Sequence, residues 1–318
     1  MKSAENSVLI GLLAYPGAQA SALHGLSEFF SVATENRPSE SVPALVPQIV
    51  ELDDTLVASL PLEKAFHVII CPPRLQNAPP RVSASQISWL QAQHKAGCVM
   101  CSVCAGVLIL AQAGLLDGRQ ATTHWQLSDG FQQQFPQVNF KPDQILIDNG
   151  DIITAGGVMA WVDMGLHLIE RFHSPTLMLS IARQFVVESG KREQRYFSSF
   201  QPKLSHGDQA ILRVQHFLQK SLSDSHTLHS MADLAGLSER TFGRRFKLLT
   251  GMTPLSYLHH VKVEEARKRL ELSSDSFGEI AWAVGYKDTE AFRNVFLRIV
   301  GLGPKEYRSR FGITNRHR

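Results

Sequence analysis

The chain has 318 residues, 44% of them apolar, with 32 Lys and Arg against 29 Asp and Glu. This length corresponds to about two domains, and the apolar fraction provides core material for both, which excludes a disordered or fibrous protein. Residues 1–13 lack the features of a secretory signal, and no run reaches ~18 apolar residues, so we expect a cytoplasmic protein without membrane contact.

The charge is distributed unevenly along the chain. Residues 209–318 hold 18 Lys and Arg against 11 Asp and Glu, a net charge of +7, whereas residues 1–208 hold 14 against 18, a net charge of −4. A basic C-terminal third suits a polyanionic partner, and the phosphate backbone of double-stranded DNA is the usual one. A solvated basic face without a partner is the alternative.

The cysteines predict neither a disulfide framework nor a metal site. Three of the four, Cys98, Cys101 and Cys104, are bunched in one predicted strand and turn, which is not the spacing of a disulfide scaffold. A strand directs Cys98 and Cys101 to opposite faces, and the sequence shows no second cluster of ligands. We therefore expect no iron–sulfur cluster, no other metal and no cofactor.

In the first 188 residues, predicted strands and helices alternate. We expect strands at 8–14, 42–52, 68–71, 98–103, 121–124, 144–148 and 151–154, and helices at 20–33, 85–94, 105–113, 159–172 and 176–188. The strands are apolar, as in a buried parallel sheet, and residues 148–151, DNGD, predict a hairpin turn. The sequence thus predicts a doubly wound α/β domain with a largely parallel sheet over 1–190, a polar linker over 191–208 and a helical domain over 209–318.

Cys104 lies where the strand 98–103 meets the next helix. In open α/β sheets ligands bind at this position, and a helix N-terminus there lowers the pKa of a thiol. The stretch 101–125, CSVCAGVLILAQAGLLDGRQATTHW, together with 15–17, YPG, and 154–157, TAGG, closely resembles the ThiJ/PfpI superfamily. That superfamily is a cysteine-elbow branch of the class I glutamine-amidotransferase-like fold.

The resemblance implies roles for three residues. Cys104 would be the nucleophile, Glu28 the acid that contacts it and His124 a nearby base. Independently of the resemblance, Trp125 is either a core aromatic or a ligand contact. Hydratases of the superfamily carry Asp where this chain has Ala22, and Pro-Gly-Gly where it has residues 72–74, PPR.

Both departures argue against catalysis. Ala22 leaves the site without a carboxylate, and Pro73 has no N–H to donate to an oxyanion. We expect a retired site that binds a ligand; a structural relic, or a cysteine-dependent hydratase or amidase, are the alternatives.

Residues 231–251, MADLAGLSERTFGRRFKLLTG, predict a helix-turn-helix. A short apolar helix ends at Gly236, and Ser238 is a good N-cap for the second helix. On that helix the apolar residues share one buried face, and a cationic stripe lies about 200° away. The apolar residues are Phe242, Phe246 and Leu249, and the stripe is Arg240, Arg244 and Lys247.

The same pattern recurs about 50 residues later, and internal repeats are a strong architectural signal. The landmarks Ala232, Gly236, Phe242, Phe246, Gly251, Pro254 and Tyr257 are matched by Ala281, Gly285, Phe292, Phe296, Gly301, Pro304 and Tyr307. Residues 254–272 between the copies predict one connector helix. With the closing 301–308, GLGPKEYR, the last ~100 residues resemble the DNA-binding domain of the AraC/XylS family.

A ThiJ/PfpI domain followed by an AraC/XylS domain is typical of the GlxA-like transcriptional regulators. We expect the first copy to contact DNA through Ser238, Arg240, Gly243, Arg244 and Lys247, and the second through Thr289, Glu290, Arg293 and Asn294. The two would read major-groove segments roughly 34 Å apart.

The predicted function is that of a sequence-specific regulator and activator whose N-terminal domain senses a small nitrogenous metabolite. The implied partners are DNA, RNA polymerase and a second copy bound through the N-terminal domain. An N-terminal domain that only dimerises is the alternative.

Overall fold

The computed structural model describes residues 6–54, 66–76, 79–189 and 193–313. The chain divides into two compact units, Met1–Gln194 and Arg195–Arg318. Residues 191–192 of the predicted linker lie outside the described residues. No helix in the described ranges is long and apolar enough to cross a membrane.

The N-terminal unit is built on a six-stranded sheet of order β2-β1-β3-β4-β8-β7. Its strands are β1 (Ser7–Ala14), β2 (Ala44–Glu51), β3 (Val68–Cys71), β4 (Val99–Val103), β7 (Leu146–Asp148) and β8 (Ile152–Ala155). Neighbouring strands are parallel except β7 and β8. The predicted doubly wound, largely parallel sheet is confirmed. Because β1 has β2 on one side and β3 on the other, the strand order reverses at β1.

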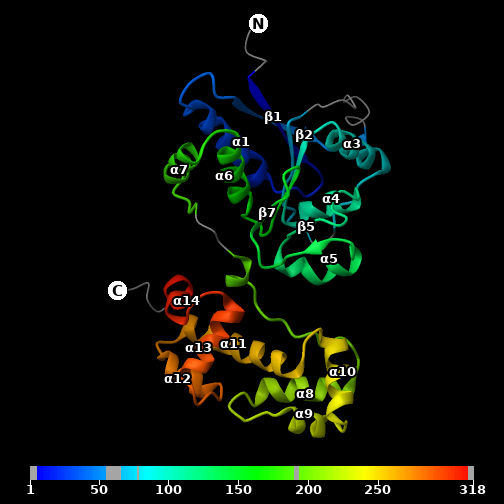
Figure 1. Cartoon of the computed structure of the whole chain (residues 1–318), viewed down its shortest axis with the longest axis vertical. Helices are drawn as coiled ribbons and strands as arrows, with labels where there is room; N and C mark the ends of the chain where they lie inside the picture. The colour runs from blue at the N-terminus through cyan, green and yellow to red at the C-terminus, as the bar shows by residue number, and fades with distance from the viewer. Residues whose placement is uncertain (1–5, 55–65, 77–78, 190–192, 314–318) are drawn as a thin grey trace. The chain divides into compact units, whose positions relative to one another are not determined.

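Helices cover both faces of this sheet (Figure 1). One face packs against α1 (Ala20–Glu35), α6 (Trp161–Phe172) and α7 (Pro175–Gln184), and the other against α3 (Ala84–Lys95) and α4 (Val107–Gln112). Side chains of successive strand residues enter opposite cores. Cys101 accordingly lies in the first core and Cys98 in the second, which confirms that they point apart.

One predicted strand is much shorter in the structure. Of 121–124, only Ala121 belongs to a strand, β5 (Gln120–Ala121), which pairs with β6 (Asn139–Phe140) in a separate two-stranded sheet. The next two residues instead bond to β8 and to the turn after β4: the Thr154 hydroxyl accepts the Thr122 N–H at 3.0 Å, and the Thr123 hydroxyl donates to the Cys104 carbonyl at 2.7 Å. Periodicity cannot reveal strands of two residues, and β6 and α5 (Ser128–Gln134) were not predicted.

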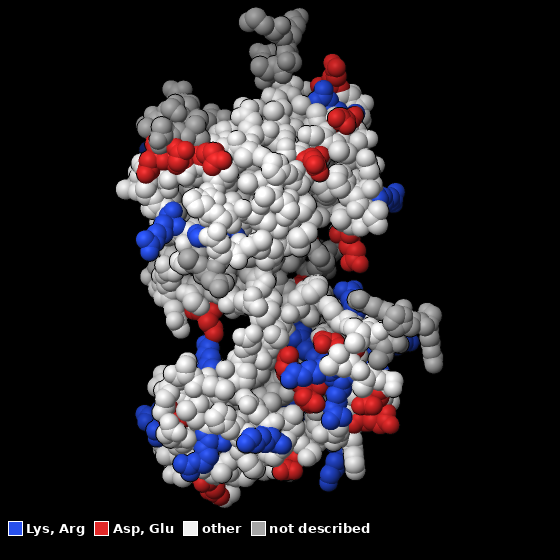
Figure 2. Space-filling view, turned by 180° about the vertical axis from the view of Figure 1, so that it is seen from behind, with Lys and Arg blue, Asp and Glu red and all other residues white. Residues whose placement is uncertain are grey.

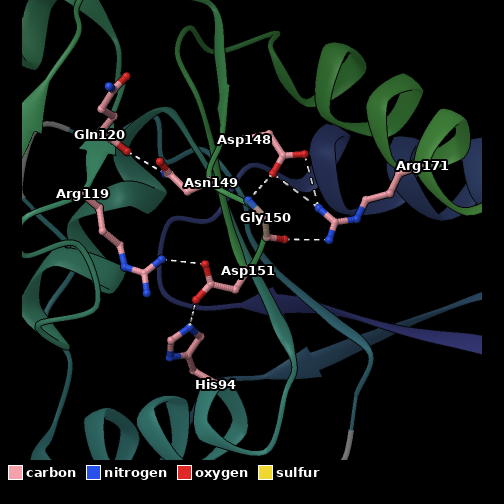
Figure 3. A network of polar contacts seen from close by, with 8 residues as sticks. All are labelled: His94, Arg119, Gln120, Asp148, Asn149, Gly150, Asp151 and Arg171. Atoms are coloured by element: carbon pink, nitrogen blue, oxygen red, sulfur yellow. Dashed lines mark hydrogen bonds and ion pairs between the residues drawn. The ribbon is translucent and has the colours of Figure 1, made fainter.

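The hairpin between β7 and β8 is present as predicted and is held by ion pairs (Figure 3). Asp151 accepts from Arg119 at 2.6 Å and from His94 at 2.8 Å. The hydrogen bond from Arg119 is the main reason that the pKa of Asp151 falls to about 2. Asp148 contacts Arg171, which also donates to the Gly150 carbonyl at 2.6 Å. The turn is therefore tied to α3 through His94, to α6 through Arg171 and to the loop before β5 through Arg119.

The C-terminal unit is helical, as predicted. Its helices are α8 (Gln209–Lys220), α9 (Leu228–Ala235), α10 (Glu239–Thr250), α11 (Pro254–Leu272), α12 (Phe277–Ala283), α13 (Thr289–Val300) and α14 (Pro304–Phe311). The connector α11 begins and ends at the predicted residues. Its first half contributes Tyr257 and Leu258 to one core and its second half Ala266 and Leu270 to another, so it runs from one group of helices to the other (Figure 1).

The described part of the expected linker has tertiary contacts. Gln194 is 2% exposed within the N-terminal unit. In the C-terminal unit, Arg267 of α11 donates to the Tyr196 carbonyl at 3.1 Å, and the Phe200 ring lies 5.1 Å from that of Tyr257. These contacts show that the segment is not a free spacer. The boundaries at 190 and 208 stay a prediction.

Candidate functional site

The first helix-turn-helix, α9 and α10, is called the first head. Gly236 ends α9 with a φ of 68°, a left-handed conformation that favours glycine. The Ser238 hydroxyl accepts the Thr241 N–H and caps α10. Because Phe242 and Phe246 are fully buried, the opposite face of α10 is open to solvent. Ser238, Arg240, Arg244 and Lys247 are exposed on it, with Gly243 half-buried among them.

The exposed cations of the first head are uncompensated. Among the described residues, Arg240, Arg244 and Lys247 have no ion pair, whereas Arg245 pairs with Asp208 at 2.5 Å. On the face drawn in Figure 2, Lys and Arg side chains gather over the C-terminal unit. Unpaired cations along one helix face can meet phosphates or guanine edges without first breaking an internal contact.

The second helix-turn-helix, α12 and α13, is called the second head. Asp288 caps α13 by accepting the N–H groups of residues 290 and 291, and Phe292 and Phe296 are fully buried. Glu290, Arg293 and Asn294 are exposed and Thr289 is half-buried.

The structure also pairs two of the predicted DNA contacts of the second head. Arg293 Nε lies 3.2 Å from the Glu290 carboxylate, and its guanidinium lies 5.6 Å from the centre of the Phe277 ring. The i, i+3 spacing of Glu290 and Arg293 is a signal that could have predicted this pair.

A contact between the second head and the loop that joins α8 to the first head was not predicted. Gly285, with a φ of 80°, packs against the loop that follows α8: a Cβ on it would lie 2.6 Å from the Ser223 carbonyl oxygen and 2.9 Å from that of Leu222. Beside this contact, the Lys262 ammonium lies 5.2 Å from the centre of the Tyr286 ring. The spacing of the heads is therefore held by this contact as well as by α11.

Cys104 has the backbone geometry of an elbow. Its φ of 53° is positive, which is uncommon for a residue with a side chain, and strain of this kind is concentrated at functional sites. Gly106 allows the tight turn because a Cβ there would lie 2.2 Å from the Cys71 carbonyl oxygen. The strand-to-helix elbow inferred from the sequence is therefore present.

The thiol of Cys104 does not have the lowered pKa that we expected. Cys104 is 3% exposed, and burial raises its pKa to about 11 although a hydrogen bond from the Ala105 backbone acts in the opposite direction. The helix that follows starts with one 3-10 turn, and α4 itself has six residues. So short a helix does not offset desolvation of a thiolate, and the thiol is neutral at physiological pH.

The residues expected around Cys104 are only partly brought together. Glu28 lies on the exposed face of α1, because the helix turns Leu26 and Phe29 inward. Cys104 is buried, and no contact between Glu28 and Cys104 is observed among the described residues. The ring of His124 stacks on Trp125, with centroids 5.5 Å apart, and burial lowers the pKa of His124. Both side chains are half-buried.

The loop that carries His124 and Trp125 is held by a residue that the sequence did not single out. The Gln194 side chain accepts the Trp125 N–H at 3.2 Å and donates to the Thr123 carbonyl at 2.8 Å. Thr123 in turn bonds the Cys104 carbonyl. No local signal marks Gln194, because its partners lie 50 to 72 residues away. In the described ranges, no group of three His, Cys, Asp or Glu side chains could hold a metal ion.

Family models match both units. The model described as "Helix-turn-helix domain" matches residues 231–310, which include both heads. The model described as "DJ-1/PfpI family" matches residues 75–171, which include the Cys104 elbow.

Curated relatives match across both units. The chain is 30% identical to the HTH-type transcriptional regulator ArgR of Pseudomonas aeruginosa over 240 residues, 73% of this chain and 70% of that protein. It is 30% identical over 235 residues to the HTH-type transcriptional regulator GbdR of the same species, covering 71% of this chain but only 62% of GbdR. It is 29% identical to the HTH-type transcriptional regulator GlxA of Rhizobium meliloti, covering 66% of this chain and 65% of GlxA.

Proposed function

We propose that this chain, which belongs to the AraC family of helix-turn-helix transcriptional regulators with an N-terminal DJ-1/PfpI-family domain, is a cytoplasmic, sequence-specific activator controlled by a small molecule. One observation carries the DNA-binding part. The fold repeats a buried core twice and leaves the outer face of each second helix, α10 and α13, exposed. Faces of this kind fit the major groove.

The contacts to DNA divide by chemistry. On α10, Arg240 and Arg244 read bases, Gly243 allows the close approach, and Ser238 and Lys247 meet phosphates. On α13, Arg293 and Asn294 read bases, and Glu290 accepts from cytosine N4 while it orients Arg293. Thr289, in the first turn of α13, is the fourth residue of the second head that we expect to contact DNA.

The N-terminal unit senses the metabolite near Cys104, His124 and Trp125. A nitrogenous cation would gain from the stacked aromatic faces of His124 and Trp125. Catalysis is not proposed, since a neutral Cys104 thiol is a poor nucleophile. The exposed Leu179 and Val186, 40% and 91% exposed, support dimerisation through this unit, and an activator would also contact RNA polymerase.

Footprinting of the full chain on DNA upstream of its own gene tests the DNA-binding part. We expect protection of two major-groove segments per chain about one helical turn apart; protection of one segment would contradict the two-head interface. A thermal-shift screen of amines, amino acids and quaternary ammonium compounds tests sensing, because a ligand that binds the native state raises the melting temperature. Sedimentation velocity at several concentrations tests dimerisation.

A further inference from the structure

The division between the two units falls between consecutive residues, Gln194 and Arg195. Both belong to one 3-10 turn, Gln194–Tyr196. Gln194 is bound inside the N-terminal unit, and the residues from Arg195 onward are bound inside the C-terminal unit. The peptide bond between the two therefore joins residues that are each anchored in their own unit, without a length of free chain between the anchors.

On the N-terminal side, the Gln194 amide group holds the loop that carries His124 and Trp125. Its Oε1 accepts the Trp125 N–H at 3.2 Å, and its Nε2 donates to the Thr123 carbonyl at 2.8 Å. A Cβ on Gly156 would lie 2.0 Å from this Nε2, so the amide group is packed against backbone as well. The loop therefore cannot shift without moving Gln194 or breaking buried hydrogen bonds, which is costly.

On the C-terminal side, Arg267 of the connector α11 holds the residues that follow. This side chain is 6% exposed. Its guanidinium donates to the carbonyl groups of Arg195, at 2.8 Å, of Tyr196, at 3.1 Å, and of Ser198. Glu264, on the same helix, lies 3.7 Å from it. Because a buried guanidinium is costly unless its donors are bonded, α11 depends on these carbonyl groups as much as they depend on it.

The same segment packs against the second head. Gly301, which ends α13, has a φ of 83°. A Cβ on it would lie 2.3 Å from Arg195 Nε and 2.8 Å from the Tyr196 ring. The Phe197 ring meets that of Phe311 edge to face, with centroids 5.4 Å apart. A displacement of this segment would therefore reach the end of α13, the helix that we expect to enter the major groove.

We propose that residues 194–198 transmit the state of the loop 122–125 to the connector and the second head. Gln194 binds the loop at one end, and Arg267 binds the carbonyl groups at the other. The inference rests on the proposed function, because it takes sensing near His124 and Trp125 and DNA binding by the heads as its two ends. Coupling between sites is reciprocal in free energy. DNA on the heads should therefore change how readily the loop 122–125 opens.

Hydrogen–deuterium exchange of the full chain, with and without DNA from upstream of its own gene, tests the coupling without a known effector. We expect DNA to change the exchange rate of the peptide that contains residues 122–125 at least twofold. Insertion of Gly-Ser-Gly-Ser between Gln194 and Arg195 leaves both anchors in place and should abolish this change. The matched control is the same insertion between Pro38 and Ser39, in an exposed turn of the N-terminal unit, which should preserve it.

Two substitutions test the anchors themselves. Gln194→Ala and Arg267→Gln should each reduce the DNA-induced change to less than half of that in the unmodified chain. The exposed Lys268 is next to Arg267 on the same helix, and Lys268→Gln should leave the change intact. If Arg267→Gln unfolds the C-terminal unit, the insertion and Gln194→Ala still decide, because neither alters the connector.

The outcomes separate the coupling from the proposed function. If the unmodified chain binds DNA and the loop 122–125 exchanges at the same rate in both states, the coupling is wrong and DNA binding stands. A DNA-induced change that survives both the insertion and Gln194→Ala would also overturn the proposal, since the signal would then follow another route. If the unmodified chain does not bind DNA, the proposed function has failed, and the coupling fails with it.

Discussion

The two heads have separate cores built on the same pattern, and they differ in their outward faces. In the first, the rings of Phe246 and Tyr257 meet edge to face with centroids 5.2 Å apart; in the second, Phe296 and Tyr307 do the same at 5.6 Å. Both second helices end at a glycine with positive φ, 79° at Gly251 and 83° for its counterpart. The repeat has therefore kept the aromatic pair and the glycine that ends the second helix.

The outward faces differ in charge at the positions of the first head's cationic stripe, although α13 also exposes Arg293 and Arg298. At the positions that correspond to Arg240, Arg244 and Lys247, the second head carries Glu290, Asn294 and Leu297. Three uncompensated cations provide affinity that does not depend on sequence, whereas a carboxylate and an amide add little affinity and discriminate between bases. We therefore expect a larger loss of affinity from changes on the first head than from the corresponding changes on the second, with base preference affected on both.

The largest effect should come from breaking the element that both heads share. Glu265 lies half-buried in the middle of α11 and pairs with Arg269 at 3.2 Å. Glu265→Pro should cost about 3 kcal/mol or more of stability, because proline removes a helical hydrogen bond and clashes with the preceding turn. Urea unfolding and DNA titration measure this, with Glu265→Ala as the control that removes only the ion pair. Equal DNA affinity for the two variants would show that the connector does not set the spacing.

The contact between Gly285 and the loop that follows α8 can be tested separately from the connector. Gly285→Ala should destabilise the C-terminal unit by about 1–3 kcal/mol, because the added Cβ is both strained and pressed against two carbonyl groups. Gly236→Ala is the matched control: its φ is also positive, but open space surrounds it, so about 1 kcal/mol is expected. Thermal unfolding compares the two, and equal losses would contradict a contact that holds the heads together.

The difference in outward charge predicts different binding defects. Arg244→Ala should cost about 1–3 kcal/mol on the cognate site and relax the preference for one base. The corresponding Asn294→Ala should relax preference in the other half of the site with a smaller loss. Mobility-shift titrations on cognate and random DNA measure both. If Arg244→Ala weakens both DNAs equally, Arg244 contacts a phosphate.

Acid should weaken the ion pair between Arg245 of the first head and Asp208. The second head lacks this pair, because Val295 stands at the position of Arg245. Burial opposes ionisation of Asp208, but the Ile211 N–H, Arg245 and the Ala210 N–H together lower its pKa. This stabilisation is present above the unfolded pKa of about 3.9 and is lost as pH falls through the folded value. Asp208→Asn should therefore cost about 0.5–1 kcal/mol at pH 7 and progressively less below pH 4. A constant difference from pH 7 to 3 would contradict this origin.

The smallest effect is expected for Glu290→Ala. Loss of the pair with Arg293, 3.2 Å away, should loosen base preference at one position, while the dependence of affinity on salt stays almost unchanged because no phosphate contact is lost. Titration at several salt concentrations decides this. A markedly steeper salt dependence would mean that Arg293, once released, binds a phosphate. Glu290 would then act by holding Arg293 in place and not by contacting a base.

The sequence alone determined those features that are encoded within a few residues. The bounds of α11 follow from the Thr253 cap, Pro254 in the first turn and the apolar period that follows. The heads follow from their glycines and paired phenylalanines, and the parallel sheet from its apolar strands. Each signal is local, because helices and turns form by hydrogen bonds between near neighbours.

Only the tertiary structure decided what depends on distant parts of the chain. Burial fixed the neutral thiol of Cys104, the packing of α1 turned Glu28 outward, and Gly285 met a loop that lies more than 60 residues earlier. The free energy of a charge or a polar group depends on what surrounds it in space, and neither spacing nor composition contains that information.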